Sequence, residues 1–327
     1  MLVVFHGQTA LTFFNGFPAL LGEPFEVVAL PDALTSKADF DAYRAADVIV
    51  CPKLTDSSPR PEKARLFQCP GAGYDAVRLD LLPASTTVSN CFGHEDAIAE
   101  YIMAALLMSH LPIAEADHAL RRGEWFPHWA GNPHGMHGEI SGLSLGLLGF
   151  GRIGKAVADR ARAFKMTINV ANRTRPESLD GIDGFWHLDK LDAFCATSDV
   201  IVVSLALMPE TKGIVGADCF SAMKPGAWLM NVARGPVVDE DALFAALRDK
   251  QIGGAVIDTW YSYPEPLATQ ASPSRHPFHE LTNVVMTPHM SGWTLGTIER
   301  RKRFIAGNIE RLQRGEPILN VVRPGMP

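Results

Sequence analysis

The glycine-rich segment Gly149–Gly154 is the feature that most constrains how this chain can fold. It reads Gly-Phe-Gly-Arg-Ile-Gly and directly follows the apolar run Leu145–Leu148, while Lys155–Phe164 continues it with helical spacing. In a strand–turn–helix unit of this kind, one glycine permits the tight turn and another lets backbone N–H groups approach a pyrophosphate. The third lets the helix pack closely on the strand, so the pattern predicts a dinucleotide-binding loop rather than a plain connection. The expected contact residues are Gly149, Gly151, Arg152, Ile153 and Gly154.

Short apolar runs alternate with helix-compatible segments on both sides of this loop, which is typical of a parallel sheet covered by helices. Before the loop, the expected strands are Leu2–Phe5, Glu26–Leu30, Val48–Cys51, Leu66–Cys69 and Thr87–Asn90, with a helix at Phe40–Ala46. From the loop onward, the expected strands are Ser144–Gly149, Thr167–Ala171, Val200–Leu205, Ala227–Asn231, Gly254–Asp258 and Val284–Thr287. The expected helices of this part are Arg152–Phe164, Leu188–Ala196, Glu240–Lys250 and Thr294–Arg314. The chain therefore predicts an α/β protein with doubly wound parallel sheets.

The overall charge and the apolar stretches exclude several classes of protein. With 327 residues, 47% of them hydrophobic, and a net charge of -6, the chain has the composition of a soluble globular protein with room for two cores. Nucleic-acid binding needs a clustered basic surface, and the densest basic run, Arg300–Arg303, is interpreted as the solvated face of a helix. The first residues do not resemble an export signal, and Ala97–Leu111 is too short to span a bilayer. We therefore expect a cytoplasmic protein with no nucleic-acid or membrane partner.

The cysteines and the clustered histidines do not form a pattern of metal ligands. None of the 5 cysteines belongs to a CxxC pair, and their odd number favours reduced thiols over a disulfide framework. His128, His134 and His137 lie within one glycine-rich stretch, but no cysteine or carboxylate completes a tetrahedral set at a usual spacing. We predict that the protein binds no metal.

The residues after the second strand of the dinucleotide unit indicate which cofactor binds. NAD sites normally carry Asp or Glu there, which accepts hydrogen bonds from the ribose hydroxyls. Here the segment 171–175 reads Ala-Asn-Arg-Thr-Arg, with two guanidinium groups and no carboxylate. Arginine can bind a 2′-phosphate through paired hydrogen bonds, so we expect NADP to be preferred over NAD. The alternative is that Arg173 stacks on the adenine ring, as it can with either cofactor. The expected contacts are Asn172, Arg173, Thr174 and Arg175.

Several motifs occur in the order in which one known family has them. They are Gly71–Asp75, Gly142–Gly154, Pro209–Thr211, Met223–Gly226, Asn231–Gly235 and Thr287–His289. Together they resemble the D-isomer-specific 2-hydroxyacid dehydrogenase family. The resemblance implies two Rossmann-like domains with the active site in the cleft between them: a flavodoxin-like substrate domain of residues 1–93 and 293–327, and a dinucleotide-binding domain of residues 94–292. It also implies a homodimer, for which the loop-rich stretch 112–138 is the expected arm.

The same resemblance implies an oxidoreductase acting on a CH–OH group, which reduces a 2-keto acid such as glyoxylate or hydroxypyruvate with a nicotinamide cofactor. Arg234 would hold the substrate carboxylate and polarise its 2-keto oxygen, a task suited to its fixed donor geometry. His289 would be the general acid and base, because imidazole titrates near neutral pH. The resemblance places Ala72, Gly73, Asn90, Arg234 and Ser291 at the substrate. It places Leu205, Thr211, Val232, Asp258, His289 and Gly292 at the cofactor, with Asp258 holding the nicotinamide carboxamide.

One position departs from the family pattern. The family pairs its catalytic histidine with a glutamate five residues after the aspartate that matches Asp258, and here Tyr263 occupies that place. Such a partner raises the histidine pKa and fixes the orientation of its ring. Either a short insertion lets Glu265 act as the partner, or His289 has no carboxylate partner.

The second alternative points to formate dehydrogenases, whose motifs the segments Asp258–Trp260 and Thr287–Leu295 resemble. Formate oxidation releases no hydroxyl proton and therefore needs no general base. A 2-keto acid reductase with an atypical histidine partner, for which Glu265 is the candidate, is the preferred interpretation, and oxidation of formate, phosphite or another small anion is the alternative. A third hypothesis, from another class, is a non-catalytic NAD(P)-sensing protein, which the presence of Arg234 and His289 disfavours.

Overall fold

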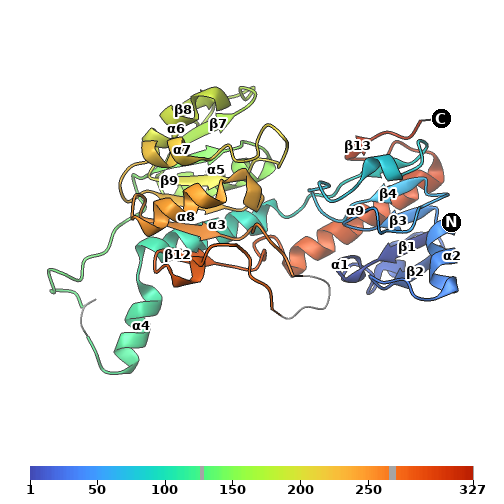
Figure 1. Cartoon of the computed structure of the whole chain (residues 1–327), viewed down its shortest axis with the longest axis horizontal. Coiled ribbons are helices and arrows are strands. Elements are labelled where there is room, and N and C mark those ends of the chain that lie inside the picture. Colours follow the sequence, from blue (N-terminus) through green and yellow to red (C-terminus); the bar gives the residue numbers. More distant parts are fainter. Residues whose placement is uncertain (126–128, 265–269, 327) are drawn as a thin grey trace. The chain divides into compact units, whose positions relative to one another are not determined.

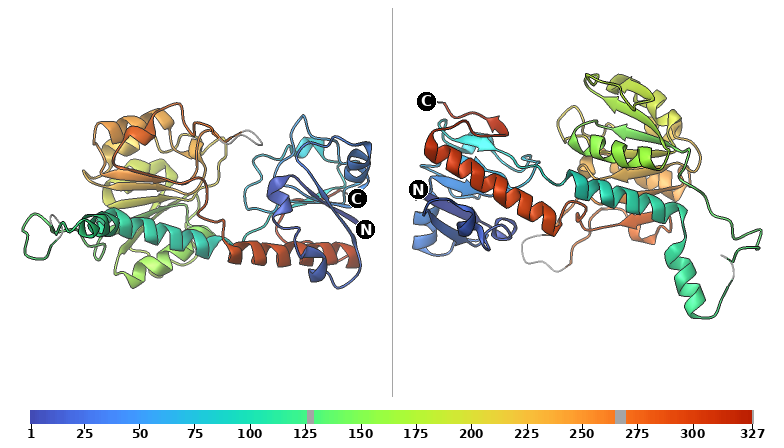
Figure 2. Two further views of the ribbon diagram at one scale, coloured as in Figure 1. Left: turned by 90° about the horizontal axis from the view of Figure 1, so that it is seen from below. Right: turned by 180° about the vertical axis from the view of Figure 1, so that it is seen from behind.

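The computed structural model describes residues 1–125, 129–264 and 270–326, and the chain forms two compact units (Figures 1 and 2). Unit 1 consists of Met1–His94 and Trp293–Pro327, and unit 2 of Glu95–Gly292. Each unit has a sheet with buried hydrophobic clusters on its faces. The expected α/β class with two parallel-sheet units is confirmed.

Unit 1 is built on a sheet whose strand order is β13-β5-β4-β3-β1-β2. Its strands are β1 (Leu2–His6), β2 (Glu26–Leu30), β3 (Val48–Val50), β4 (Leu66–Gln68), β5 (Thr87–Ser89) and β13 (Val321–Arg323). The parallel strands follow the order 2-1-3-4-5 that is typical of flavodoxin-like sheets. The edge strand β13 was not expected and pairs antiparallel with β5. Asn320, at φ 53°, precedes it and accepts a hydrogen bond from the Asn90 N–H, which joins the C-terminal tail to the sheet.

The two longer helices of unit 1 begin at residues whose side chains cap them. The helices of unit 1 are α1 (Gln8–Leu11), α2 (Lys37–Ala45) and α9 (Leu295–Arg314), with the 3-10 turns η1 (Phe17–Leu20) and η2 (Leu79–Leu81). A capping box of Ser36 and Asp39 starts α2 three residues before the expected Phe40. In α9, Arg301 is buried and its Nε donates to the Phe92 carbonyl, so the interpretation of Arg300–Arg303 as a wholly solvated face was wrong. A basic run cannot reveal which of its members points inward.

Unit 2 is built on a sheet whose order is β12-β11-β10-β9-β6-β7-β8, and all its neighbouring strands are parallel. Its strands are β6 (Ser144–Leu148), β7 (Thr167–Asn172), β8 (Gly184–His187), β9 (Val200–Val203), β10 (Trp228–Asn231), β11 (Gly254–Ile257) and β12 (Val284–Met286). All strands expected from apolar runs in either unit are present, with ends that differ by at most two residues. The edge strand β8 was not expected, because it is half-exposed and has no apolar run.

The sheet of unit 2 is buried on both faces, as a doubly wound sheet requires. Alternate residues of β9 join different clusters: Val200 and Val202 pack with α3 and α5, whereas Ile201 and Val203 pack with α6, α7 and α8. The helices are α3 (Glu95–His110), α4 (Ile113–Arg121), α5 (Arg152–Ala163), α6 (Leu191–Thr197), α7 (Ala217–Ala222) and α8 (Glu240–Arg248). The 3-10 turns are η3 (Leu188–Lys190), η4 (Gly235–Val237) and η5 (Phe278–Glu280).

The segment after α3 extends away from the sheet of unit 2 (Figures 1 and 2). The stretch 112–138 was expected to be loop-rich, but it begins with the helix α4, which keeps Ile113 and Leu120 exposed. Among the described residues, no single helix is long and apolar enough to cross a membrane. The pair α3 and α4, bent by 57° at its break, has the required length and composition only when both helices are counted together.

The parallel register aligns the carboxyl ends of the strands of unit 2. Leu148 of β6 lies beside Val203 of β9, which lies beside Asn231 of β10. Asn231 in turn lies beside Ile257 of β11, and Ile257 beside Met286 of β12. The chain direction of the connections reverses between β6 and β9, and such a switch point is where open α/β sheets bind their ligands.

Candidate functional site

The glycine loop after β6 assigns a different steric role to each of its three glycines. Gly149 has φ 100°, and a Cβ there would lie 3.1 Å from the backbone of Ser204 and Leu205. A Cβ on Gly154 would lie 2.5 Å from the Gly149 carbonyl oxygen, so α5 packs against the loop only without a side chain. At Gly151 a Cβ would meet nothing within 4 Å, which leaves the backbone open to a ligand. These are the turn, packing and close-approach roles of a dinucleotide loop.

The start of α5 offers backbone N–H groups beside this loop. Gly151 is the N-cap residue, no side chain caps the helix, and its first turn holds no acidic residue. The N–H groups of Arg152, Ile153 and Gly154 lie in the first turn, where a helix has no internal acceptors. The positive end of the helix dipole and these donors favour an anion such as a pyrophosphate.

Residues that follow β9 and β10 line the same edge of the sheet. Leu205 comes two residues after β9 and Val232 directly after β10. Thr211 is buried and shapes the turn between them, since its hydroxyl donates to the Ala206 carbonyl at 2.7 Å and accepts from the Met208 N–H at 2.8 Å. The expected cofactor residues therefore lie at the carboxyl edge that carries the glycine loop.

The tip of β7 carries the residues expected to select the cofactor. Asn172 ends the strand, and its amide donates to the Thr174 carbonyl at 2.8 Å. The guanidinium of Arg175 lies 5.4 Å from the centre of the Phe185 ring. Arg173 is exposed and makes no ion pair with any residue that the structure describes. The Arg173 guanidinium is therefore accessible to solvent at the tip of β7.

The turn after β10 holds Arg234 in a defined conformation. The fully buried Asn231 side chain accepts from the Ala233 N–H and donates to the Arg234 carbonyl, each at 3.1 Å. The Arg234 guanidinium donates to the Ala233 carbonyl at 2.8 Å. A Cβ on Gly235 would lie 2.3 Å from the Trp260 carbonyl oxygen, so this turn is in direct contact with the segment after β11.

The Asp258 carboxylate holds the loop that carries His289. It is fully buried and accepts hydrogen bonds from the Thr287 hydroxyl at 2.6 Å, the Met290 N–H at 2.8 Å and the Ser291 N–H at 3.1 Å. Because the Thr287 proton goes to Asp258, the Tyr101 hydroxyl, 2.7 Å from Thr287, must be the donor in that contact. Burial raises the pKa of Tyr101 to about 12, which keeps this donor protonated.

His289 is exposed and sits in the left-handed region at φ 57°. Residues other than glycine adopt this conformation uncommonly, and it persists where the surroundings hold it. Its Nδ1 lies 2.9 Å from the Tyr263 hydroxyl, which also accepts the Trp260 N–H at 3.2 Å. Glu265, the partner expected from the sequence, lies outside the described residues.

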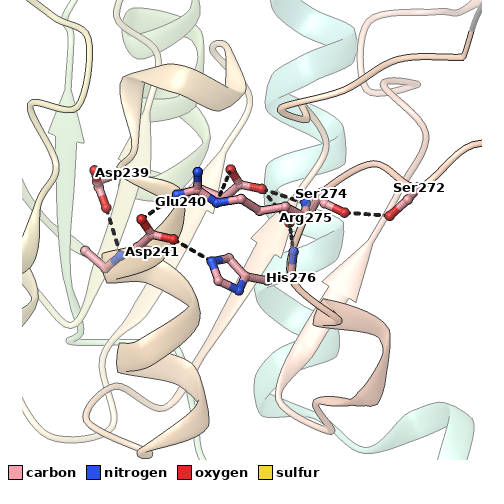
Figure 3. A network of polar contacts seen from close by, with 8 residues as sticks. Asp239, Glu240, Asp241, Ser272, Ser274, Arg275 and His276 are labelled. Carbon is pink, nitrogen blue, oxygen red and sulfur yellow. Dashed lines mark hydrogen bonds and ion pairs between the residues drawn. The ribbon is translucent and has the colours of Figure 1, made fainter.

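Residues 272–276, which precede η5, are attached to the start of α8 (Figure 3). The N–H groups of Tyr261 and Ser262 both donate to the Pro273 carbonyl, which brings the two ends of this excursion together. Three of the next residues bind carboxylates at the first turn of α8, where the helix dipole also favours negative charge. Ser274 and Arg275 donate to Glu240, and Arg275 and His276 contact Asp241. These contacts hold the pKa of Asp241 below its usual range.

Unit 1 brings together three of the residues expected at the substrate. Asn90 follows β5, and its amide donates to the Ala72 carbonyl at 2.8 Å. The Cys91 N–H donates to the Gly71 carbonyl at 3.0 Å, so the segment Gly71–Gly73 lies against the end of β5. All 5 cysteines are free and buried, and burial raises the pKa of Cys51 and Cys69 to about 12, which makes these two thiols unreactive.

Comparison with known proteins identifies the family. A sequence model described as "D-isomer specific 2-hydroxyacid dehydrogenase, NAD binding domain" matches residues 103–291. The chain belongs to the D-isomer specific 2-hydroxyacid dehydrogenase family. The matched region lies within unit 2 and includes the glycine loop, Arg234, Asp258 and His289.

Individual proteins agree with this assignment. A glyoxylate reductase of Thermofilum pendens is 34% identical over 222 residues, which are 68% of this chain and 63% of that protein. A D-3-phosphoglycerate dehydrogenase of Methanocaldococcus jannaschii is 30% identical over 308 residues, which are 92% of this chain and 56% of that protein. The chain thus spans less than two thirds of the length of either relative. A crystal structure of a D-isomer specific 2-hydroxyacid dehydrogenase from Xanthobacter autotrophicus Py2, in complex with NADPH and MES, is 27% identical with a TM-score of 0.75, covering 98% of this chain and 97% of that one.

Several contacts of this family member were missed by sequence reasoning. Tyr263 was noted only as a substitute for a glutamate, and its contact with His289 could not be read from the spacing. Tyr101 lies on α3, far along the chain from Thr287, and no local pattern indicates their contact. Among the residues that the structure describes, no group of three His, Cys, Asp or Glu side chains is arranged to hold a metal ion.

Proposed function

We propose that the protein is an NAD(P)-dependent reductase of small 2-keto acids, of the size of glyoxylate or hydroxypyruvate, that forms the D-2-hydroxy acid. The observation that carries this proposal is the register of β6, β9, β10, β11 and β12, which aligns the glycine loop, Arg234 and His289 at one edge of one sheet. The glyoxylate reductase relative supports the substrate class. A bound nicotinamide supplies the hydride that is added to the 2-carbon.

Arg234 is proposed to bind the substrate through its guanidinium group. Its fork of N–H donors can hold a carboxylate and polarise the neighbouring keto oxygen, where negative charge develops as the hydride arrives. The turn held by Asn231 and Gly235 fixes the backbone of Arg234, which supports this role. In unit 1, the N–H groups of Ala72 and Gly73 are proposed to bind the carboxylate, with Asn90 beside them.

His289 is proposed to donate the proton that the keto oxygen receives, and to take it back in the oxidative direction. Imidazole suits both directions because its pKa lies near neutral pH. The Asp258 network supports the role, since it holds the loop in a conformation that costs free energy and exposes the ring. Ser291 and Gly292 follow in the same loop and are proposed to contact substrate and cofactor.

NADP is proposed to be preferred over NAD. The exposed Arg173 at the tip of β7, the hydroxyl of Thr174 and the absence of a carboxylate in segment 171–175 support this preference. A carboxylate at this place would repel a 2′-phosphate, whereas a guanidinium binds it. The NADPH complex of the Xanthobacter autotrophicus structure is compatible with the proposal.

We also propose a homodimer that forms through the arm of residues 112–138. Its helix α4 extends away from unit 2 and exposes Ile113 by 67% and Leu120 by 51%, and the segment after it exposes Trp125, Trp129 and Met136. Exposed apolar residues concentrated on one extension indicate a surface that another chain covers. A hollow of about 480 Å³ at the joint of α3 and α4, lined by Met108, Pro112 and His137 among others, lies at the base of this arm. The free, buried thiols support a reducing compartment such as the cytoplasm.

The proposal is tested by substrate turnover. Oxidation of NADPH and NADH is followed with glyoxylate, hydroxypyruvate, pyruvate and phenylpyruvate, and reduction of both cofactors with formate and phosphite. We expect turnover in the first set, with the smaller keto acids preferred. Turnover only in the second set would mean that the protein is a dehydrogenase of small anions and not a 2-keto acid reductase. Tight cofactor binding without any turnover would indicate a sensor.

A further inference from the structure

The Tyr263 hydroxyl lies between the imidazole of His289 and a fixed backbone donor. It is 2.9 Å from Nδ1 of His289 and 3.2 Å from the Trp260 nitrogen, whose N–H donates to it. Tyr263 stands five residues after Asp258, where the family pattern has a glutamate. At this position a phenol hydroxyl therefore contacts the histidine, where the family pattern has a carboxylate.

The hydroxyl can bind His289 in both of its protonation states. It has one proton and two lone pairs, of which the Trp260 N–H uses one lone pair. Beside a charged ring, Nδ1–H donates to the second lone pair, and Nε2–H can give its proton to the substrate oxygen. The neutral ring that results keeps its proton on Nδ1, which still donates to the hydroxyl, so that the lone pair on Nε2 can take a proton back. The contact between the hydroxyl and Nδ1 therefore needs no rearrangement when Nε2 gains or loses its proton.

A carboxylate at this place would act differently. It can only accept, and its negative charge stabilises the charged ring, which raises the pKa of the histidine. A phenol has a pKa of about 10 and is neutral at the pH at which imidazole titrates. It therefore orients the ring without adding a charge that favours the imidazolium.

We propose that Tyr263 is the positioning residue of His289: it holds Nδ1, leaves Nε2 to exchange the proton with the substrate oxygen, and does so without the charge of a carboxylate. The identity of the proton acceptor rests on the proposed reductase function, whereas the contact between Tyr263 and His289 does not. A ring paired with a phenol gives up its proton more readily than a ring paired with a carboxylate. The Tyr263–His289 pair therefore suits reduction at mildly acidic to neutral pH.

The position of Tyr263 is linked to the His289 loop through Trp260. Trp260 is buried, its indole N–H donates to the Thr287 carbonyl at 2.8 Å, and its ring packs edge-on against Phe278. The end of the excursion is attached to α8 through Glu240 and Asp241, as Figure 3 shows. The same residue, Trp260, thus contacts the His289 loop through its side chain and Tyr263 through its backbone.

The other ionisable groups of this network lie directly after β11 and on α3. Asp258 is buried, and its carboxylate accepts hydrogen bonds from Thr287, Met290 and Ser291. Tyr101 contacts Thr287. Their influence on His289 is common to the native protein and to every variant at position 263. Differences among those variants therefore report the group at that position.

The test compares Tyr263→Phe, Tyr263→Glu and Tyr263→Gln in the full-length protein, with Glu265→Gln as the matched control. The pKa and tautomer of His289 are measured by NMR of nitrogen-labelled histidine, with His289→Gln identifying the signal. We expect the native neutral ring to carry its proton on Nδ1, which donates to the Tyr263 hydroxyl, and to leave Nε2 unprotonated. We expect Tyr263→Glu to raise the pKa by about 1 unit or more, and Tyr263→Gln and Glu265→Gln to leave it near the native value. These measurements need no turnover, so they remain decisive if the proposed function fails.

Kinetics provide the second readout. Reduction needs the protonated ring, so kcat/KM falls as the pH rises through the pKa of His289. We expect Tyr263→Glu to move this fall to higher pH, and Tyr263→Phe to lower kcat about 10-fold with little change in the KM for cofactor. If Glu265→Gln lowers the pKa of His289 by a unit or more and Tyr263→Phe changes neither the tautomer nor kcat, Glu265 is the partner and the inference is wrong.

Discussion

The Thr287 hydroxyl donates a 2.6 Å hydrogen bond to the buried Asp258 carboxylate, and His289 follows two residues later at φ 57°. The same carboxylate accepts the N–H groups of the two residues after His289. A left-handed conformation at a non-glycine residue costs about 1–3 kcal/mol and persists only where its surroundings compensate for it. Asp258 provides that compensation, so its first role is to shape the loop that exposes the imidazole.

Replacing Asp258 with Asn therefore destabilises the protein. The amide keeps the shape of the side chain but turns one acceptor into a donor, which then faces buried donors in place of an oxygen. We expect a loss of about 2 kcal/mol in the free energy of unfolding, measured in urea. Asp218→Asn, which changes an exposed carboxylate on α7, is the control and leaves the midpoint unchanged. Equal midpoints for the two variants would remove Asp258 from this role.

Gly235→Ala tests the contact between the Arg234 turn and the segment after β11. Its Cβ would lie 2.3 Å from the Trp260 carbonyl oxygen, which belongs to the backbone and cannot rotate away. We expect a loss of about 1–3 kcal/mol in stability together with lower kcat/KM, because the turn must move. Gly307→Ala in α9 has open space around it, so it should stabilise the protein by about 0.5–1 kcal/mol. A neutral effect of Gly235→Ala in thermal unfolding would contradict the close approach.

Arg173→Ala tests the selection of the cofactor. Loss of a guanidinium that binds the 2′-phosphate should weaken the binding of NADPH about 10-fold and leave the binding of NADH nearly unchanged. Dissociation constants for both cofactors come from quenching of protein fluorescence. Lys190→Ala, an exposed cation at the start of α6, serves as the control and should change neither constant. If the affinities for NADPH and NADH fall by the same factor, Arg173 stacks on the adenine ring and does not bind the 2′-phosphate.

The arm is tested by the paired substitution Ile113→Glu and Leu120→Glu. Burying two carboxylates in an apolar interface is costly, so the variant should sediment as a monomer at concentrations where the native chain is a dimer. Far-UV circular dichroism should stay the same, because both side chains are exposed in the single chain. A native chain that sediments as a monomer would overturn the proposed dimer.

The sequence predicts most of the sheet because parallel strands buried on both faces are apolar throughout. The runs 200–203 and 254–257 have this character, and both form strands. Strands β8 and β13 were not predicted since they lie at sheet edges, are partly exposed and depend on a neighbour for their hydrogen bonds. Helix α4 was missed because its apolar residues face outward and do not mark a core.

The site could be predicted where chemistry is local and not where it depends on contacts across the chain. The three glycines of the loop lie within six consecutive residues, so their roles could be predicted from the local sequence. Each glycine has the expected surroundings in the structure. The environment of His289 depends on Tyr101, Asp258 and Tyr263, which approach it from α3, the end of β11 and a separate excursion. Spacing alone could locate a missing glutamate but could not identify the hydroxyl that contacts the ring.

The most direct test of the account is kcat/KM for glyoxylate reduction by NADPH in the native protein and in Arg234→Lys, with Arg248→Lys on the exposed end of α8 as the control. Lysine keeps the charge but loses the paired donors that are proposed to bind the carboxylate and the keto oxygen. We predict turnover by the native protein, a fall of about 100-fold or more in Arg234→Lys with unchanged NADPH affinity, and native kinetics in Arg248→Lys. Native turnover by Arg234→Lys would contradict the proposed reductase site.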